Sequence, residues 1–448
     1  MSQLPEGWVR KKLGEVIMSG PQNGLYKSQT FYGSGNRIVR IDNFYDGILN
    51  PQESFRRVQI EPEELALYKL NQGDILVNRV NSMTHIGKCA NIKGLTEETV
   101  FESNIMRFAL DSQIAHTQYV VHFLTSPSGL KEIRKNAKQA VNQASINQQD
   151  VKGVEIFLPP LPVQHQIVAK IEELFSELDA GVQELKTALA RLKTYRQAVL
   201  HHYLNNPDWE RVKLGDVVKR VFDGPFGSNL KTSDYIPQPG YQVIRLENVG
   251  RMEFIGEKET FISEDKFTSL EKHEIFDGDI VFSSFVGENV RATLIPQLKY
   301  KAINKADCFC IRTDENQVNR KFLVYSLSTE RVHKTVTLDV HGATRPRINT
   351  SQLKNLEMPF PGLTTQTQIV SEIEARLSEA DAMEATIRQE LVRAENLRQS
   401  ILKQAFEGKL ITTSVDKLKL EELEAIPELF PVYEGRNAGS SGDQLSLF

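Results

Sequence analysis

The stretch Val163–Leu204 reads VQHQIVAKIEELFSELDAGVQELKTALARLKTYRQAVLHHYL. Its apolar side chains recur at steps of mostly three and four residues, the pattern of a long helix whose seam packs against a partner helix. At about 1.5 Å per residue, such a helix is about 60 Å long, which is the dimension of a spacer. The seam consists of Ile167, Ile171, Leu174, Leu178, Val182, Leu185, Leu189, Leu192 and Val199.

The partner helix is predicted in the same chain, because the same seam recurs 202 residues later without an insertion. The first helix leads away from one globular part, and the second can run back towards it. We therefore predict that the two helices pack antiparallel and hold two globular parts at opposite ends of one rod. The second seam consists of Ile369, Ile373, Leu377, Ala380, Glu384, Ile387, Leu391, Ala394 and Ile401.

The rest of the chain is also written twice, and internal repeats decide an architecture before any local motif does. Trp8 in GWVRKKLGEV aligns with Trp209 in DWERVKLGDV. Further landmarks follow in the same order and at nearly the same spacing. They are Arg40 with Arg245, Gly73-Asp74-Ile75 with Gly278-Asp279-Ile280, Ser145-Ile146-Asn147 with Arg347-Ile348-Asn349, and the Pro-Leu segments before Gln164 and Gln366.

Each copy is predicted to be an α+β unit, in which a β-rich globular domain is followed by a long helix. Short β-rich runs such as IVRI, IMRFAL, YQVIRL and CFCIRT are separated by Gly, Asn and Asp turns. Short helices are expected at Thr117–Leu124, at Gly129–Lys138 and over RKFLVYSLS. The predicted boundaries are 1–158 and 207–360 for the two globular domains, 159–206 and 361–410 for the helices, and 411–448 for a tail.

Composition predicts a cytoplasmic globular protein. The 448 residues are 40% hydrophobic and 25% charged, enough for two or three ordinary cores. No apolar run is long enough to cross a membrane, and MSQLPEGWVRKK lacks the apolar core of a signal peptide. Three cysteines agree with a reducing compartment, and Cys308 and Cys310 are expected to be packed thiols.

The net charge of −4 does not decide whether the protein binds nucleic acid. Residues 411–448 hold seven Asp and Glu against three Lys and Arg, so the tail accounts for the whole acidic excess. The neutral body can still carry basic grooves, because binding follows local clustering of charge. The acidic tail itself is predicted to be flexible.

Signatures of catalysis are missing from the sequence. It has no G-x-x-x-x-G-K-[ST] phosphate loop, no G-x-S-x-G elbow, no H-E-x-x-H zinc helix and no Asn/Asp-Pro-Pro-aromatic tetrapeptide of amino-methyltransferases. Asp74 and Asp279 are interpreted as structural turn residues. We therefore predict a non-catalytic protein without cofactor or metal, and an enzyme with an unrecognised site is the weaker alternative.

Polar loops differ between the two copies although the landmarks around them match. Asn, Gln and Arg can make bidentate contacts with base edges, and Lys and Ser suit phosphates. Recurrence at equivalent places favours DNA binding over a merely solvated surface. The predicted DNA-binding residues are Gln22, Asn23, Tyr26, Lys27, Asn78, Arg79, Asn81, Lys88, Lys138, Gln139, Asn142, Ser228, Asn229, Lys231, Ser283, Ser284, Arg291, His341, Arg345 and Arg347.

With these features the chain resembles the DNA-specificity subunits of type I restriction-modification systems, over about residues 7–410. The resemblance depends on the repeated W-x-x-x-x-L-G and Gly-Asp-Ile motifs, Pro-Phe-Gly-Ser at 225–228 and Gly-Ala-Thr-Arg-Pro-Arg-Ile-Asn at 342–349. It also depends on Gln-x-Gln-Ile-Val at 164–168 and 366–370. The chain has His165 and Thr367 where the family usually has Glu.

This resemblance implies two target-recognition domains that each read one half of an interrupted, asymmetric double-stranded DNA sequence. It also implies two long helices that set the gap between the halves. Such a subunit is inactive alone and recruits two methyltransferase subunits, which methylate adenine, and restriction/translocase subunits. Candidate docking residues for the methyltransferase are Arg191, Lys193, Arg196, Arg388 and Arg393.

The end of the tail, Gln444-Leu445-Ser446-Leu447-Phe448, looks like a short peptide that bacterial proteins insert into the sliding clamp. Docking on a sister subunit, or no role at all, is the alternative for these five residues. For the chain as a whole, the alternative is a coiled-coil scaffold or adaptor without DNA sequence readout. That alternative explains the helices but not the paired landmarks in the β-rich domains.

Overall fold

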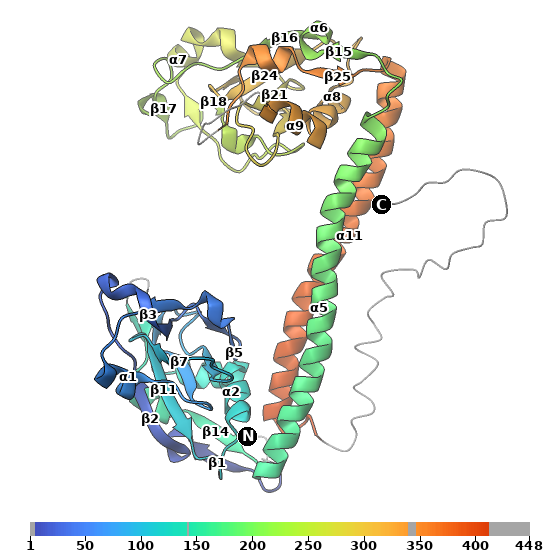
Figure 1. Cartoon of the computed structure of the whole chain (residues 1–448). Coiled ribbons are helices and arrows are strands. Elements are labelled where there is room, and N and C mark those ends of the chain that lie inside the picture. Colours follow the sequence, from blue (N-terminus) through green and yellow to red (C-terminus); the bar gives the residue numbers. More distant parts are fainter. Residues whose placement is uncertain (1–4, 141–142, 339–345, 412–448) are drawn as a thin grey trace, which may run out of the picture. The chain divides into compact units, whose positions relative to one another are not determined.

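The computed structural model describes residues 5–140, 143–338 and 346–411, and Figure 1 shows its elements. The described chain divides into two compact units. The first unit comprises the described residues up to Val182 and from Val392 onward, and the second unit is Gln183–Leu391. Each unit thus contains one β-rich part and a portion of each long helix.

The β-rich part of the first unit is centred on a four-stranded antiparallel sheet of β2 (Ile17–Asn23), β11 (Ile105–Leu110), β7 (Ile75–Asn78) and β9 (Cys89–Asn91), in that order. A three-stranded sheet orders β10 (Thr99–Phe101), β3 (Tyr32–Val39) and β6 (Arg56–Val58), and β10 runs parallel to β3. Three small sheets pair β1 (Val9–Lys12) with β14 (Glu155–Leu158), β4 (Phe44–Tyr45) with β5 (Ile48–Leu49), and β12 (Lys138–Ala140) with β13 (Gln143–Ser145) and β8 (Val80–Asn81).

Four short helices accompany these strands: α1 (Pro62–Tyr68), α2 (Thr117–Thr125), α3 (Pro127–Arg134) and α4 (Gln148–Lys152). Strand β7 is buried along its whole length, and its Ile75 and Val77 share a core with Tyr119 and Phe123 of α2. Leu76 lies in a different core, with Phe44 and Ala90, so β7 is buried on both faces and Ile75–Val77 is apolar without alternation. Short 3₁₀ turns lie at Leu13–Glu15, Gln29–Phe31 and Gln52–Ser54.

The β-rich part of the second unit repeats this plan. Its four-stranded sheet orders β16 (Val218–Phe222), β24 (Cys308–Thr313), β21 (Ile280–Ser283) and β22 (Ala292–Leu294). Its five-stranded sheet orders β17 (Tyr235–Ile236), β19 (Phe261–Ile262), β18 (Tyr241–Ile244), β23 (Ala302–Asn304) and β20 (Glu274–Ile275), with β18 parallel to β23. Strand β15 (Arg211–Lys213) pairs with β25 (Glu357–Pro359), as β1 does with β14.

The helices of this part are α6 (Leu214–Val217), α7 (Glu264–Ser269), α8 (Arg320–Leu327), α9 (Glu330–Leu338) and α10 (Thr350–Lys354), with 3₁₀ turns at Thr232–Asp234, Leu246–Asn248 and Glu271–His273. The repeated landmark asparagines have one local role, because Asn147 caps α4 and Asn349 caps α10 through their side-chain oxygens. The predicted α+β architecture with an internal repeat is therefore confirmed.

One predicted helix is wrong at its C-terminal end. The expected helix over Gly129–Lys138 is α3, which ends at Arg134. Lys138 instead begins β12, which forms a hairpin with β13 that extends to β8. Pairing with a distant strand thus outweighs the local helical pattern at these residues.

The two predicted long helices are confirmed as α5 (Leu161–Leu204) and α11 (Leu363–Phe406), each 44 residues long. They pack together in both units. In the first unit Ile167 and Ile171 of α5 share a core with Ile401 of α11, and in the second unit Val199 shares one with Ile369. Early residues of α5 thus meet late residues of α11, so the pairing is antiparallel.

Ion pairs between the helices follow the same register. Asp179 pairs with Arg398 in the first unit, and Arg196 pairs with Asp381 at 2.7 Å in the second. Arg196 also pairs with Glu384 at 2.7 Å. This ion pair explains why a carboxylate occupies one of the otherwise mostly apolar positions of the second seam. Both helix ends use predicted terminators, since α5 stops before Asn205 and Gly408 follows α11 with a φ of +71°.

Each long helix is fastened to its own β-rich part by one buried glutamine. The Oε1 of Gln164 accepts the backbone N–H of His116 at 2.8 Å, and its Nε2 donates to the carbonyls of Ile114 and Pro159. Gln366 makes the same three bonds, with the N–H of Asn319 at 2.8 Å and the carbonyls of Gln317 and Pro361. Both glutamines are 0% exposed. The repeated glutamine therefore has a structural role, because its hydrogen bonds attach the start of each long helix to the adjoining β-rich part.

The Gly-Asp-Ile landmarks are also structural. The Oδ2 of Asp74 accepts the backbone N–H of Asn71, and the Oδ2 of Asp279 accepts that of Phe276. Asp279 in addition holds Arg312 at 2.6 Å. Cys308 and Cys310 are buried free thiols as predicted, and Cys89 is buried and free as well. Burial raises the pKa of the Cys308 thiol to about 12. In the part of the chain that the structure describes, no helix is long and apolar enough to cross a membrane.

Candidate nucleic-acid interface

Two of the predicted polar loops of the first unit bond to the segment that connects β10 to β11, and a third loop bonds to one of these two. We call Glu102–Asn104 the first hub. The N–H of Ser103 donates to the carbonyl of Leu25 at 2.8 Å, and the N–H of Arg79 donates to the carbonyl of Asn104 at 2.9 Å. The third loop joins through the N–H of Ile146, which donates to the carbonyl of Arg79 at 3.0 Å. Backbone hydrogen bonds at the first hub thus join loops that are far apart in the sequence.

The second unit has the same connections on Lys305–Asp307, the second hub. The N–H of Ala306 donates to the carbonyl of Pro225 at 3.4 Å, and the N–H of Ser284 donates to the carbonyl of Asp307 at 2.8 Å. The N–H of Ile348 then donates to the carbonyl of Ser284 at 3.0 Å. All three bonds join residues equivalent to those of the first unit. The backbone frame is therefore constant while the side chains on it differ.

Several predicted residues of the first unit have internal partners. Lys27 pairs with Glu64 of α1 at 2.7 Å. Asn78 is 1% exposed and Arg79 donates from Nη1 to the carbonyl of Ser103 at 3.0 Å. The Nη2 of Arg107 donates to Gln22 at 2.5 Å. These four predicted residues stabilise the loops, and their contact with DNA stays a prediction.

Other predicted residues of the first unit are exposed or half-buried. Asn23 and Tyr26 are exposed at the end of β2 and just beyond it. Lys138 and Gln139 are exposed on β12, and the small sheet β12-β13-β8 brings them near Asn81, whose Oδ1 accepts the N–H of Ser82. Lys88 lies over the ring of Tyr45 at 4.2 Å, and burial lowers the pKa of its amine. Asn142 lies outside the described residues.

The second unit divides its predicted residues in the same way. Ser283 and Ser284 are 0% and 2% exposed, and the Nη2 of Arg291 donates to the Oγ of Ser283 at 3.2 Å. Arg347 is exposed, lies over the ring of Phe285 at 4.1 Å and pairs with Asp307 at 3.2 Å. Further exposed residues are Ser228, Asn229 and Lys231. His341 and Arg345 lie outside the described residues.

Sequence reasoning missed the hubs themselves. The carboxylate of Glu102 in the first hub accepts a hydrogen bond from Arg40 at 3.0 Å. The equivalent Lys305 of the second hub instead donates a hydrogen bond to the hydroxyl of Tyr235 at 2.7 Å. The two units therefore carry opposite charges at one point of a shared frame. The signal was available, because both residues lie three positions before the repeated strands IMRFAL and CFCIRT.

A hollow of about 270 Å³ lies beside the first hub. Its wall includes Tyr26, Lys27, Arg40, Arg56 and Glu102. Lys27 pairs with Glu64 and Arg40 pairs with Glu102, so Arg56 carries the excess positive charge of this wall. One excess cation favours a phosphate at this place, although the whole chain is slightly acidic.

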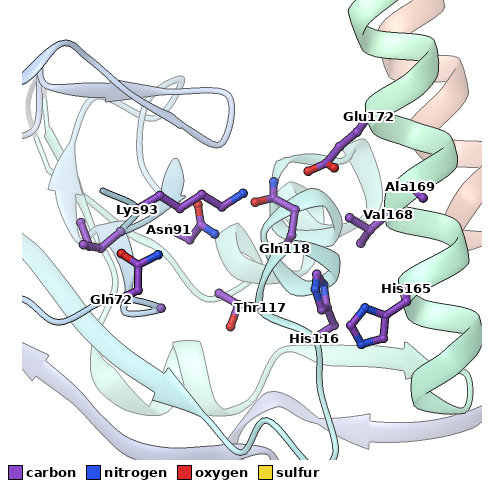
Figure 2. A pocket seen from close by; sticks show the side chains of 12 residues that line it. Gln72, Asn91, Lys93, His116, Thr117, Gln118, His165, Val168, Ala169 and Glu172 are labelled. Carbon is purple, nitrogen blue, oxygen red and sulfur yellow. The ribbon is translucent and has the colours of Figure 1, made fainter. Parts of the chain in front are cut away.

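A second pocket of the first unit, of about 470 Å³, lies where α2 meets the first turns of α5 (Figure 2). The rings of His116 and His165 meet edge to face with centroids 4.3 Å apart, and the side chains of Lys93 and Glu172 also line the pocket. Among the predicted DNA-binding residues that the structure describes, none lines this pocket. The pocket lies beside the hydrogen bond between Gln164 and His116, so it belongs to the contact that attaches α5 to the β-rich part.

His122 lies 3.3 Å from the side chain of Gln118, which lines this pocket, and its burial predicts a loss of stability in acid. Burial, together with the charges of Lys93, Arg398 and His116, lowers the pKa of His122 to about 4. The unfolded chain takes up this proton first, near pH 6.5, so stability is lost as the pH falls from about 6.5 towards 4. We expect the free energy of unfolding of the first unit to fall by about 2 kcal/mol between about pH 6.5 and pH 5 from this group.

The measurement uses urea unfolding followed by the fluorescence of Trp8 in a Trp209→Phe background, since the chain has two tryptophans. The second unit has Tyr325 at the equivalent position of α8, so His122→Tyr is the matched variant. That variant should lose this acid sensitivity. An unchanged fall of stability in His122→Tyr would contradict the assignment.

The two β-rich parts hold their loops by the same backbone hydrogen bonds, but the side chains on these loops differ. This arrangement is typical of a recognition protein with two distinct reading surfaces. The type I restriction modification DNA specificity domain matches the chain twice, over residues 5–187 and 206–393. The chain therefore belongs to this family and is the non-catalytic DNA-specificity subunit of a type I restriction-modification system. Family membership favours DNA recognition over the scaffold alternative.

Relatives support this assignment over most of the chain. The MjaX type I restriction enzyme specificity subunit of Methanocaldococcus jannaschii is 26% identical over 425 residues, which cover 92% of this chain and 95% of that one. The EcoKI specificity subunit of Escherichia coli is 30% identical over 198 residues, 44% of this chain and 42% of that one.

Solved structures show the same fold. A chain from a structure of type I restriction-modification complex assembly and conformational transition has a TM-score of 0.70 and 18% identity, and the match covers 92% of this chain and 100% of that one. The HsdS subunit from Thermoanaerobacter tengcongensis has a TM-score of 0.51 and 17% identity, over 91% of this chain and 98% of that one.

Proposed function

We propose that residues 1–158 and 207–360 are two target-recognition domains, each of which reads one half of a bipartite, asymmetric duplex DNA target. The observation that carries this proposal is the constant frame with unlike side chains. The same three backbone bonds hold the loops in both units, yet the first hub carries Glu102 and the second carries Lys305. One frame with two sets of side chains suits two unlike half-targets.

We further propose that α5 and α11 form a spacer that fixes the gap between the half-targets. Interlocked apolar side chains support this role, since Leu192 is 8% exposed and packs with Ala380 and Ile387 in the second unit. A stiff pair of helices converts a fixed protein length into a fixed number of base pairs, as rigid spacing does in dimeric DNA binders.

The predicted partners are two methyltransferase subunits and restriction/translocase subunits, in the cytoplasm. Among the candidate docking cations, Arg191 and Lys193 are exposed on α5. Arg196 and Arg388 both contact Glu384, so they also stabilise the coil. The proposed clamp-binding peptide, residues 444–448, lies outside the described residues.

An exchange of domains tests the proposal. Residues 207–350 are replaced by those of a homologue with another target, and methylated sites are mapped by sequencing the DNA of cells that express the chimaera. We expect only one half of the recognised sequence to change, with the other half and the gap preserved. Exchange of residues 1–158 is the reciprocal control and should change the other half. Changes in both halves after a single exchange would refute the division of labour.

A further inference from the structure

The structure aligns two aromatic residues that the sequence repeat leaves unpaired. In the antiparallel registers, Gln22 of β2 faces Arg107 of β11, and Phe222 of β16 faces Cys310 of β24. Counting on from these equivalent positions, Gly24 corresponds to Gly224 and Tyr26 corresponds to Phe226. Phe226 is not among the predicted DNA-binding residues. The signal for it was the Gly-Pro-Phe run two residues after β16.

The backbone just before each of the two aromatic residues packs tightly against the neighbouring hub. Gly24 and Gly224 press against the backbone of the hubs so closely that a Cβ at either position would overlap carbonyl atoms of residues 101–102 or 304–305. The next residues, Leu25 and Pro225, are buried and bond to the hubs. The carbonyl of Phe226 also accepts the N–H groups of Asn229 and Leu230, which closes the turn. The backbone that carries each ring is therefore held in place beside its hub.

Both rings are presented to solvent. Tyr26 is 79% exposed and Phe226 is 63% exposed. In the part of the chain that the structure describes, neither ring stacks on another ring or on a cation. A single exposed aromatic residue is ordinary, but the same exposure at one equivalent position in both units, within loops of otherwise different sequence, indicates a shared task.

We propose that Tyr26 and Phe226 are a matched pair of wedges, each of which enters a base step in its own half of the DNA target. Apolar side chains that enter a step unstack the bases and bend the duplex, and flat rings stack on any base. The surroundings suit phosphates, because Arg40 and Arg56 line the same hollow as Tyr26, and Lys231 directly follows the turn that the carbonyl of Phe226 closes. This inference rests on the proposed function, because it assigns one wedge to each recognition domain.

The test measures base unstacking in the assembled complex. The complex of this chain with its co-purified subunits is bound at saturation to a duplex with the target mapped by methylation sequencing, and thymine reactivity towards permanganate is read along both strands. We expect enhanced reactivity in both halves. Tyr26→Ala should return one half to the level of free duplex, and Phe226→Ala should do so only in the other half, each with about a 10-fold higher Kd.

Tyr26→Phe and Phe226→Tyr keep a flat ring and should keep the reactivity. Ile48→Ala is the matched control, since Ile48 is 63% exposed on β5 and outside the loops on the hubs. Unchanged reactivity in both Ala variants overturns the wedges. Loss of the co-purified subunits in those variants also overturns them, because it places the rings at a protein interface. Either failure leaves the domain exchange free to succeed, so the two proposals are judged separately.

Discussion

Replacing Gln366 by alanine is expected to lower the free energy of unfolding of the second unit by about 4 kcal/mol. The side chain is fully buried and makes three hydrogen bonds that join α11 to the segment before α8 and to the hinge before the helix. Truncation leaves one N–H and two carbonyls, in buried or part-buried places, without their partner, and each such loss costs about 1–3 kcal/mol. Urea unfolding followed by Trp209 fluorescence in a Trp8→Phe background measures the change.

Gln368→Ala is the matched control, because Gln368 lies on the same turn of α11 but is exposed. It should leave the stability within about 0.5 kcal/mol. Gln164→Ala should reproduce the loss in the first unit, where the same three bonds recur. Equal effects of Gln366→Ala and Gln368→Ala would show that the buried amide is not what fastens the helix.

The architecture could be predicted because its signals repeat. The apolar residues of each long helix recur at helical spacing, so each seam is visible in the sequence. The second seam follows the first at a constant shift of 202 residues, which a chance similarity would not produce. Gln164 and Gln366 were visible as landmarks, but their role was not. A glutamine near a helix start gives no sign of whether its amide is buried, since the partners lie about fifty residues away in the sequence.

The candidate site was predicted at the level of loops, and less well at the level of side chains. The loops around Lys27 and Arg79 do bond to the first hub, and the segment around Ile146 bonds to Arg79. Sequence pattern could not separate exposed residues from buried ones, because Asn78 and Ser283 end central strands, where a polar side chain faces the interior. Nor could it foresee that Lys27 pairs with Glu64, which comes from α1.

Gly224→Ala is expected to weaken binding to the half-target read by residues 207–360 by about 100-fold, or about 3 kcal/mol. An added Cβ would overlap the carbonyl oxygen of Asn304 and the carbonyl carbon of Lys305, neither of which can rotate away. The second hub must then shift. Because Ser284 bonds to Asp307 and Ile348 bonds to Ser284, the shift carries into the other two loops. All three loops lose their common placement.

Binding is measured with the co-purified complex over a range of salt, so that loss of sequence reading is separated from loss of phosphate attraction. Gly227→Ala is the matched control three residues further on, since nothing lies within 4 Å of its added Cβ. It should bind as the parent does. If both variants bind equally well, the loops tolerate movement of the hub and the frame is not what positions the reading residues.

The equivalent Gly24→Ala extends this test to the first unit. Its Cβ would meet the carbonyls of Phe101 and Glu102, so the same displacement is expected on the first hub. We expect Gly24→Ala to weaken only the half-target that Gly224→Ala leaves intact. Two identical changes with separate consequences require two independent readers on one frame. A single shared DNA surface would instead lose both halves together in either variant.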